Sequence, residues 1–224
     1  MLFPWQKNRI EKLFRLNKSN KALIEELKIE GITKNNILCA IKKVPREIFV
    51  EQQFIQRAYE NIPLPIDCGQ TTSQPYVVAY MVACLNLKKT DRVLEIGTGT
   101  GYQTAILSNL CHEVCTIEIH SNLLNKAKKR IAKLNLKNII FKLANGAEGW
   151  QDKGLFNAIV ISAASEIIPI KLLENLKNQG RLIMPKKKPS GNQKLVLVKK
   201  NNKTYLEKEL LDVKFVPLLN KNVE

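Results

Sequence analysis

Short runs of apolar residues alternate with amphipathic stretches through the C-terminal two thirds of the chain. Such runs are typical of strands buried on both faces of a parallel sheet, and they occupy residues 93–96, 114–117, 139–143, 156–161 and 180–184. Apolar positions at helical spacing predict the helices between them, over residues 102–110, 123–134 and 169–176. This alternation predicts an α/β fold with a doubly wound, mostly parallel sheet. Two further runs, 194–199 and 210–216, predict an antiparallel edge pair, and Pro185 is expected to end the fifth strand.

The N-terminal third shows helical periodicity and no strand pattern. It predicts helices over residues 1–18, 19–27, 33–43, 47–58 and 75–84. We therefore expect three parts, an N-terminal extension (1–18), a helical part (19–85) and an α/β core (86–224). The 224 residues are enough for this arrangement.

Residues 61–75 form a polar segment that cannot be a helix, because Pro63, Pro65 and Gly69 interrupt it. Uncharged hydrogen-bonding side chains fill its second half, at Gln70, Thr71, Thr72, Ser73 and Gln74. Long loops without secondary structure are usually functional or disordered. The loop therefore indicates a site for a peptide or a carboxylate, with a solvated linker as the alternative.

The strongest chemical signal is the turn after the first strand, Glu95-Ile-Gly-Thr-Gly-Thr-Gly101. Glycine lets the backbone approach a ligand closely, and strand, glycine turn and helix begin a nucleotide-binding βαβ unit. The acidic Glu95 would repel a pyrophosphate but suits a cationic ligand such as S-adenosyl-L-methionine. Glu118, 23 positions later at the end of the second strand, can accept the ribose hydroxyls. The alternatives are a tight turn that binds nothing and a strand-end surface acid.

Composition narrows the class of protein further. The net charge of +16 could attract RNA, but the lysines are dispersed and few aromatic residues are interleaved with them, so we expect no nucleic-acid partner. Five scattered cysteines form no disulfide or zinc pattern, and neither His112 nor His120 belongs to a metal or catalytic pattern, so we expect no metal and two surface histidines. The chain has no run of 18 apolar residues and no secretory signal, which favours a cytoplasmic protein without a membrane segment.

At several points the sequence resembles the protein-L-isoaspartate O-methyltransferases. The matching stretches are Val44-Pro-Arg-Glu47, Gly69-Gln-Thr-Thr-Ser-Gln-Pro75, Val93-Leu-Glu-Ile-Gly-Thr-Gly-Thr-Gly-Tyr-Gln-Thr104, Gly149-Trp150, Ser162-Ala-Ala164 and Phe215-Val-Pro-Leu218. The glycine turn is shared by many methyltransferases, whereas the Thr-x-Ser-Gln-Pro loop is much more specific. The resemblance implies a seven-stranded Rossmann-like sheet, S-adenosyl-L-methionine as methyl donor, and L-isoaspartyl residues of damaged proteins as acceptors, and we expect a monomer.

The resemblance also implies roles for single residues. Ser73 matches the active-site serine, and its neighbours Thr71, Thr72 and Gln74 are expected to contact the substrate. The cofactor site is expected to comprise Glu95, Gly97, Thr98, Gly99, Glu118, Asn145 and Gly146. Asn145 and Asn157 stand where the family usually has Asp, which predicts a weaker contact of Asn145 with the adenine.

The implied chemistry needs no general base, because a carboxylate is already ionised near neutral pH. It needs desolvation and in-line placement against the sulfonium methyl, and Ser73 could hold one carboxylate oxygen. Two alternatives stay open, an RNA-directed or other small-substrate methyltransferase and a non-catalytic S-adenosyl-L-methionine-binding homologue.

Overall fold

The structure is a computed structural model and describes residues 19–220. The helix expected over residues 1–18 lies outside the described residues. No helix within residues 19–220 is both long and apolar enough to cross a bilayer. The expected division at residues 18 and 85 stays a prediction.

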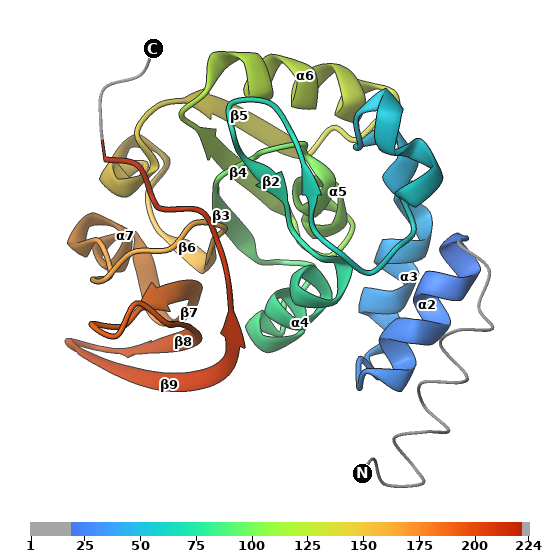
Figure 1. Cartoon of the computed structure of the whole chain (residues 1–224). Helices are drawn as coiled ribbons and strands as arrows, with labels where there is room; N and C mark the ends of the chain where they lie inside the picture. Colours follow the sequence, from blue (N-terminus) through green and yellow to red (C-terminus); the bar gives the residue numbers. More distant parts are fainter. Residues whose placement is uncertain (1–18, 221–224) are drawn as a thin grey trace, which may run out of the picture.

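A seven-stranded sheet forms the centre of the molecule (Figure 1). Its order is β5-β4-β3-β6-β7-β8-β9, and the five strands from β5 to β7 are parallel. Strands β8 and β9 add the antiparallel edge, so the expected fold class is confirmed. The strands are β3 (Arg92–Ile96), β4 (Glu113–Glu118), β5 (Ile139–Leu143), β6 (Phe156–Ile161), β7 (Leu176–Lys187), β8 (Gln193–Asn201) and β9 (Thr204–Val213).

Helices cover both faces of this sheet, as a doubly wound fold requires. The helices are α2 (Asn20–Ile29), α3 (Asn35–Lys43), α4 (Pro75–Leu85), α5 (Tyr102–Ser108), α6 (Ser121–Ala132) and α7 (Ile170–Glu174). Short 3-10 turns lie at Arg46–Ile48, Gln52–Arg57, Gly146–Glu148 and Gln151–Lys153. The segment 47–58, expected to be helical, thus consists mainly of 3-10 turns.

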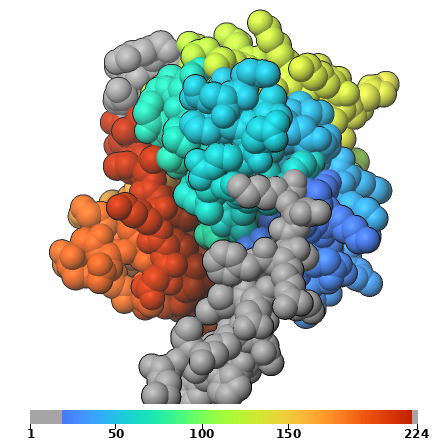
Figure 2. Space-filling view, turned by 45° about the vertical axis from the view of Figure 1, so that its right-hand side comes forward, coloured from blue at the N-terminus to red at the C-terminus, as the bar shows by residue number. Residues whose placement is uncertain are grey.

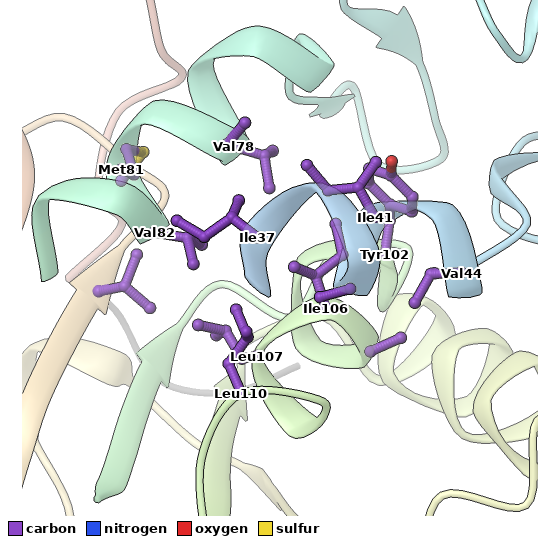
Figure 3. Close-up of a cluster of buried hydrophobic side chains, with 14 of the residues drawn as sticks. Ile37, Ile41, Val44, Val78, Met81, Val82, Tyr102, Ile106, Leu107 and Leu110 are labelled. Atoms are coloured by element: carbon purple, nitrogen blue, oxygen red, sulfur yellow. The ribbon is translucent and has the colours of Figure 1, made fainter. Parts of the chain in front are cut away.

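The larger core joins the N-terminal helices to the sheet. Helices α3, α4 and α5 meet through Ile37, Val78, Tyr102 and Ile106, which Figure 3 shows packed together. On the opposite face, Leu94, Ile96, Ile159 and Ile161 pack with Trp150 and α7. Because side chains alternate along a strand, Val93 and Glu95 face α5 while Leu94 and Ile96 face away from it.

Several element boundaries differ from the expected ones. Strand β7 continues through Pro185 to Lys187, because β6 pairs with β7 only as far as Ile183 and the missing N–H removes no bond to β6. Strand β9 begins at Thr204 rather than at 210, since residues 204–209 are exposed and lack an apolar pattern. Helix α7 is limited to five residues because β7 begins at Leu176.

The loop 61–75 contains a small ladder that its composition did not predict. Strand β1 (Leu64–Pro65) pairs with β2 (Thr71–Thr72) in antiparallel register. The segment then enters α4 at Pro75, which suits the first turn of a helix.

Candidate active site

A cleft opens at the carboxyl ends of β3, β4 and β6, where the strand order of the sheet reverses. Ligands of open α/β sheets bind at this switch point. The cleft contains about 830 Å³ of space free of protein atoms, part of it open solvent. Its walls are formed by residues 70–73, 96–100, 117–120 and 216–219, together with Ile66, Val78, Tyr102, Gln103, Leu123, Gly146, Ser162 and Ala163. The cleft therefore joins the hydroxyl-rich loop to the glycine turn.

The turn after β3 brings backbone to the cleft wall. Gly97 has φ +91 and Gly99 has φ +52, so both lie in the region that favours glycine. Thr98 also lines the cleft, but its hydroxyl lies 2.6 Å from the hydroxyl of Thr116 inside the sheet. The turn thus presents mainly backbone to a ligand.

Glu95 is fully buried beneath the cleft and does not line it. Its carboxylate accepts hydrogen bonds from Thr104 Oγ1 at 2.5 Å, Thr116 Oγ1 at 2.8 Å and Gln103 Nε2 at 3.0 Å. Burial raises the pKa of Glu95 to about 7, although the three hydrogen bonds oppose this shift. Its expected role at the cofactor stays a prediction, and in this position Glu95 can act through its charge and through the side chains that bond to it.

Glu118 lines the cleft at the end of β4. One carboxylate oxygen accepts the N–H of Gly99 at 2.8 Å, and the other accepts the N–H groups of Ile119 and His120 at 2.9 and 3.1 Å. Glu118 therefore holds the glycine turn as well as facing the cleft. A carboxylate has about four lone-pair positions, so acceptor capacity remains for a ligand hydroxyl.

The loop contributes Thr71, Thr72 and Ser73 to the cleft wall. The hydroxyl of Ser73 has no hydrogen-bond partner among residues 19–220 and is half-buried. Gln74 instead lines a second groove, which it shares with Thr71, Ser73 and residues 212–215. Figure 2 shows the loop lying beside the C-terminal segment, drawn in red, on one face of the molecule.

Arg46 holds this loop from inside the protein. Its guanidinium is fully buried and donates to the carbonyl oxygens of Ala58, Glu60, Ile62 and Ser73. Burial lowers the pKa of Arg46 to about 10, so the group stays charged at neutral pH. The cation also lies 5.6 Å from the ring centroid of Tyr102, at the start of α5.

Asn145 does not line the main cleft, whereas its neighbour Gly146 does. The side-chain oxygen of Asn145 caps the following 3-10 turn by accepting the N–H of Ala147 at 3.0 Å. Its amide donates to Asn220 Oδ1 at 2.7 Å. The contact with an adenine, expected from the position of Asn145, stays a prediction.

Several cleft residues were not among the expected site residues. Gln103, Ser162 and the segment 216–219 line the cleft, and all fall in or beside stretches that carried the resemblance. His120, expected to be a surface residue, is half-buried in the cleft wall. These stretches could have indicated the residues, but only the fold brings the segment 216–219 to the loop after β6, where Ala164 N donates to Val216 O at 2.8 Å.

Comparisons with known proteins concern the chain as a whole. A family model described as Protein-L-isoaspartate(D-aspartate) O-methyltransferase matches residues 17–223. The chain is 44% identical to the Protein-L-isoaspartate O-methyltransferase of Parvibaculum lavamentivorans over 199 residues, which cover 88% of this chain and 90% of that protein. It is 47% identical to the enzyme of the same name from Dictyoglomus turgidum over 198 residues, with 88% and 90% covered.

Solved structures show the same relationship. One titled protein-L-isoaspartate O-methyltransferase has a TM-score of 0.83 at 28% identity, and the match covers 92% of this chain and 67% of that one. A putative protein-L-isoaspartate O-methyltransferase from Plasmodium falciparum, in complex with S-adenosyl-L-homocysteine, has a TM-score of 0.78 at 25% identity, with 89% and 98% covered. The resemblance seen in the sequence motifs is confirmed, and the chain belongs to the protein-L-isoaspartate(D-aspartate) O-methyltransferase family.

Proposed function

We propose that this cleft transfers a methyl group from S-adenosyl-L-methionine to the free carboxylate of L-isoaspartyl residues in damaged proteins and peptides, which initiates their repair. One observation carries the proposal: the hydroxyl-rich loop at Ser73 and the glycine turn at Gly97 face the same cleft. The names of the relatives, which include an enzyme solved with S-adenosyl-L-homocysteine, support it.

The residues present fit the methyl donor. The cleft ends at the Glu118 carboxylate, which suits ribose hydroxyls, and its floor covers the Glu95 carboxylate, which suits a cation. Glycines at 97 and 99 let the backbone lie against the methionine part. When bound, S-adenosyl-L-methionine supplies a methyl group activated by the positive sulfur.

The acceptor explains why the cleft needs no general base. The isoaspartyl carboxylate is already ionised, so no proton has to be removed before it attacks. A carboxylate oxygen forms the new bond to the methyl carbon while the carbon–sulfur bond breaks, and the bonding electron pair stays on sulfur. Ser73 can donate its hydroxyl to the other carboxylate oxygen, and Thr71 and Thr72 lie beside it for peptide contacts. Closure of the loop over the site would exclude water.

The cellular setting is also part of the proposal. We place the enzyme in the cytoplasm as a monomer without a nucleic-acid partner. All five cysteines are free thiols, which suits a reducing compartment. Many lysines on the C-terminal strands pair with acids, such as Lys186 with Glu207 and Lys194 with Asp212, so part of the positive charge is compensated locally.

A methyl-transfer assay with paired peptides tests the function. The protein is incubated with methyl-labelled S-adenosyl-L-methionine and two peptides of the same sequence, one with isoaspartate and one with aspartate. We expect base-labile label in the isoaspartyl peptide only. Equal labelling of both peptides, labelling of RNA, or no transfer despite cofactor binding would overturn the proposal.

A further inference from the structure

Ser162, at the carboxyl end of β6, is held in place on two sides. Its N–H donates to the carbonyl of Ile96 at 2.9 Å, which fixes its backbone to the end of β3. A Cβ placed on Gly97 would lie 3.6 Å from the Cβ of Ser162, so the side chain stands directly beside the glycine turn. Ser162 is half-buried and lines the cleft.

Its hydroxyl is oriented by a neighbouring amide. Gln103 Nε2 donates to Ser162 Oγ at 2.9 Å and to Glu95 Oε1 at 3.0 Å. The ionised Glu95 carboxylate can only accept, so the nitrogen of the amide faces it, and the reversed amide would set two acceptors against each other. The Gln103 oxygen is buried and has no partner within residues 19–220, so no hydrogen bond to that oxygen competes with this orientation.

One consequence concerns the hydroxyl hydrogen of Ser162. Gln103 already occupies a lone pair of Ser162 Oγ, so the hydrogen is directed elsewhere. No acceptor for it occurs among the side chains and backbone of residues 19–220. A serine that lines a cleft with its hydrogen unused is a ready donor for an anionic ligand oxygen.

We propose that Ser162 binds a carboxylate in the cleft, with Gln103 as the positioning residue that fixes its hydroxyl as a donor. The identity of the ligands rests on the proposed function. Under that function, two ligands that carry a carboxylate bind in this cleft. One carboxylate belongs to the methionine part of the cofactor, and the other is the isoaspartyl acceptor. Both offer the same chemistry to a hydroxyl donor, so the two sources are separated by experiment.

Binding and kinetics of Ser162→Ala provide the test. The first arm is calorimetric titration with S-adenosyl-L-homocysteine and with its decarboxylated analogue, S-adenosyl-3-thiopropylamine, which keeps the amine. The second arm is KM and kcat for an isoaspartyl peptide. A hydrogen bond to a charged group corresponds to roughly a tenfold to hundredfold change in affinity. If Ser162 binds the cofactor carboxylate, we expect this loss in the affinity for S-adenosyl-L-homocysteine alone. If Ser162 binds the isoaspartyl carboxylate, we expect it in kcat/KM for the peptide alone.

Further variants separate binding from folding. Ser162→Thr keeps the hydroxyl and should retain most of the affinity. Gln103→Met should give a smaller loss in the same arm, because the hydroxyl remains but can rotate. Ser108→Ala removes a buried hydroxyl from α5 outside the cleft, where it donates to Ala105 O, and should change neither arm.

Two results would overturn the proposal. Equal losses with S-adenosyl-L-homocysteine and its decarboxylated analogue would show that the contact is not with a carboxylate, and unchanged values in both arms would show no contact. If the wild-type protein methylates no isoaspartyl peptide, the proposed function fails, and the first arm alone then decides the role of Ser162.

Discussion

Arg46 donates a hydrogen bond from its buried guanidinium to the carbonyl oxygen of Ser73, across 27 positions of the chain, at 3.3 Å. The same guanidinium binds three carbonyls from residues 58–62, at distances of 2.9 to 3.0 Å. A buried cation thus ties both ends of the loop to one point in the core. Because Arg46 also lies against Tyr102, it fixes the position of the loop relative to α5, the helix that follows the glycine turn.

Replacing Arg46 with Met should therefore reduce both stability and catalysis. One buried and three partly buried carbonyls would lose their donor, and each unsatisfied buried group costs about 1–3 kcal/mol, so a loss of about 3 kcal/mol is expected in chemical unfolding. The value of kcat/KM for an isoaspartyl peptide should fall more than the affinity for S-adenosyl-L-homocysteine, because the loop and not the glycine turn loses its anchor.

Arg57→Met is a matched control for this change. The Arg57 side chain is about half exposed and pairs with Glu60 at the surface, so its loss should cost less than about 1 kcal/mol. Equal effects of the two variants on stability and on peptide turnover would contradict the anchoring role of Arg46.

Ser73→Ala should lower methyl transfer far more than cofactor binding. The hydroxyl is half-buried and free of partners among residues 19–220, and a bond from it to a carboxylate corresponds to roughly a tenfold to hundredfold change in kcat/KM. Steady-state kinetics and calorimetry with S-adenosyl-L-homocysteine measure the two quantities. Ser121→Ala, an exposed serine at the start of α6, serves as the control. Unchanged turnover of the Ser73 variant would remove this residue from the mechanism.

Glu118→Ala should weaken cofactor binding by about 1.5–3 kcal/mol for each lost bond to a ribose hydroxyl. The structure adds a second cause, because the N–H of Gly99 also loses its acceptor and the glycine turn is loosened. Calorimetry measures the affinity. Glu113→Ala, at the opposite end of the same strand, removes a carboxylate that pairs with Arg92 and should leave the affinity unchanged. If both variants bind as tightly as wild type, Glu118 is only a strand-end acid.

Local patterns account for much of this fold and for part of its site. The strands β3, β4 and β6 follow from their apolar runs, since strands buried on both faces leave that pattern. The exposed first half of β9 has no such pattern, and its pairing with β8 is set by a two-residue turn between Asn201 and Thr204. Edge strands of this kind are specified by their partner more than by their own sequence.

The site shows the same limit. Gly97, Gly99 and Glu118 could be predicted because a glycine turn of this spacing after a strand indicates a cofactor site from the sequence alone. The relation between Gln103 and Ser162, 59 positions apart, depends on the register of β3 with β6 and leaves no local signal. The burial of Arg46 leaves no local signal either, because arginine side chains are mostly exposed and the carbonyls that pair with this one lie 12 to 27 positions further along the chain.

Asn145→Asp should tighten S-adenosyl-L-methionine binding, by about 1 kcal/mol at most. A carboxylate oxygen can still accept the N–H of Ala147, so the cap is kept, and a second acceptor is gained in place of the amide. Asn157→Asp is the control, because Asn157 accepts from the Arg92 N–H at the start of β3, outside the cleft. Calorimetry should show no change there. Equal or weaker binding by the Asn145 variant would show that Asn145 does not replace an aspartate of the family.

The Asn145-Gly146 pair also allows a test by ageing. Asn-Gly pairs in flexible chains deamidate readily, but the side-chain oxygen and amide of Asn145 are both held, by Ala147 and Asn220. Mass spectrometry of the peptide that contains Asn145 should therefore find little deamidation in folded protein stored at neutral pH, and faster deamidation in unfolded protein. Equal rates in the two samples would contradict a locked turn.

Glu95 predicts a dependence of stability on pH. Its pKa is about 7 in the folded protein against an ordinary value of 4.5, so between these values the folded chain binds a proton that the unfolded chain releases. The contribution of Glu95 to the free energy of unfolding is therefore fully present below about pH 4.5 and is lost as the pH rises to about 7. The loss amounts to about 3 kcal/mol. Glu95→Gln removes this titration and keeps the size of the side chain.

Unfolding by urea at pH 5, 6, 7 and 8 measures the effect. Relative to wild type, Glu95→Gln should gain stability as the pH rises, by up to about 3 kcal/mol at pH 8. The same variant should bind S-adenosyl-L-methionine roughly tenfold more weakly at pH 8, because a negative charge close beneath a cationic ligand is lost. Glu148→Gln removes an exposed carboxylate that pairs with Lys171, and it should show neither effect. If the variant loses affinity but gains no stability at high pH, Glu95 is not the buried, titrating group described here. If it gains stability but keeps its affinity, the charge of Glu95 does not contribute to cofactor binding.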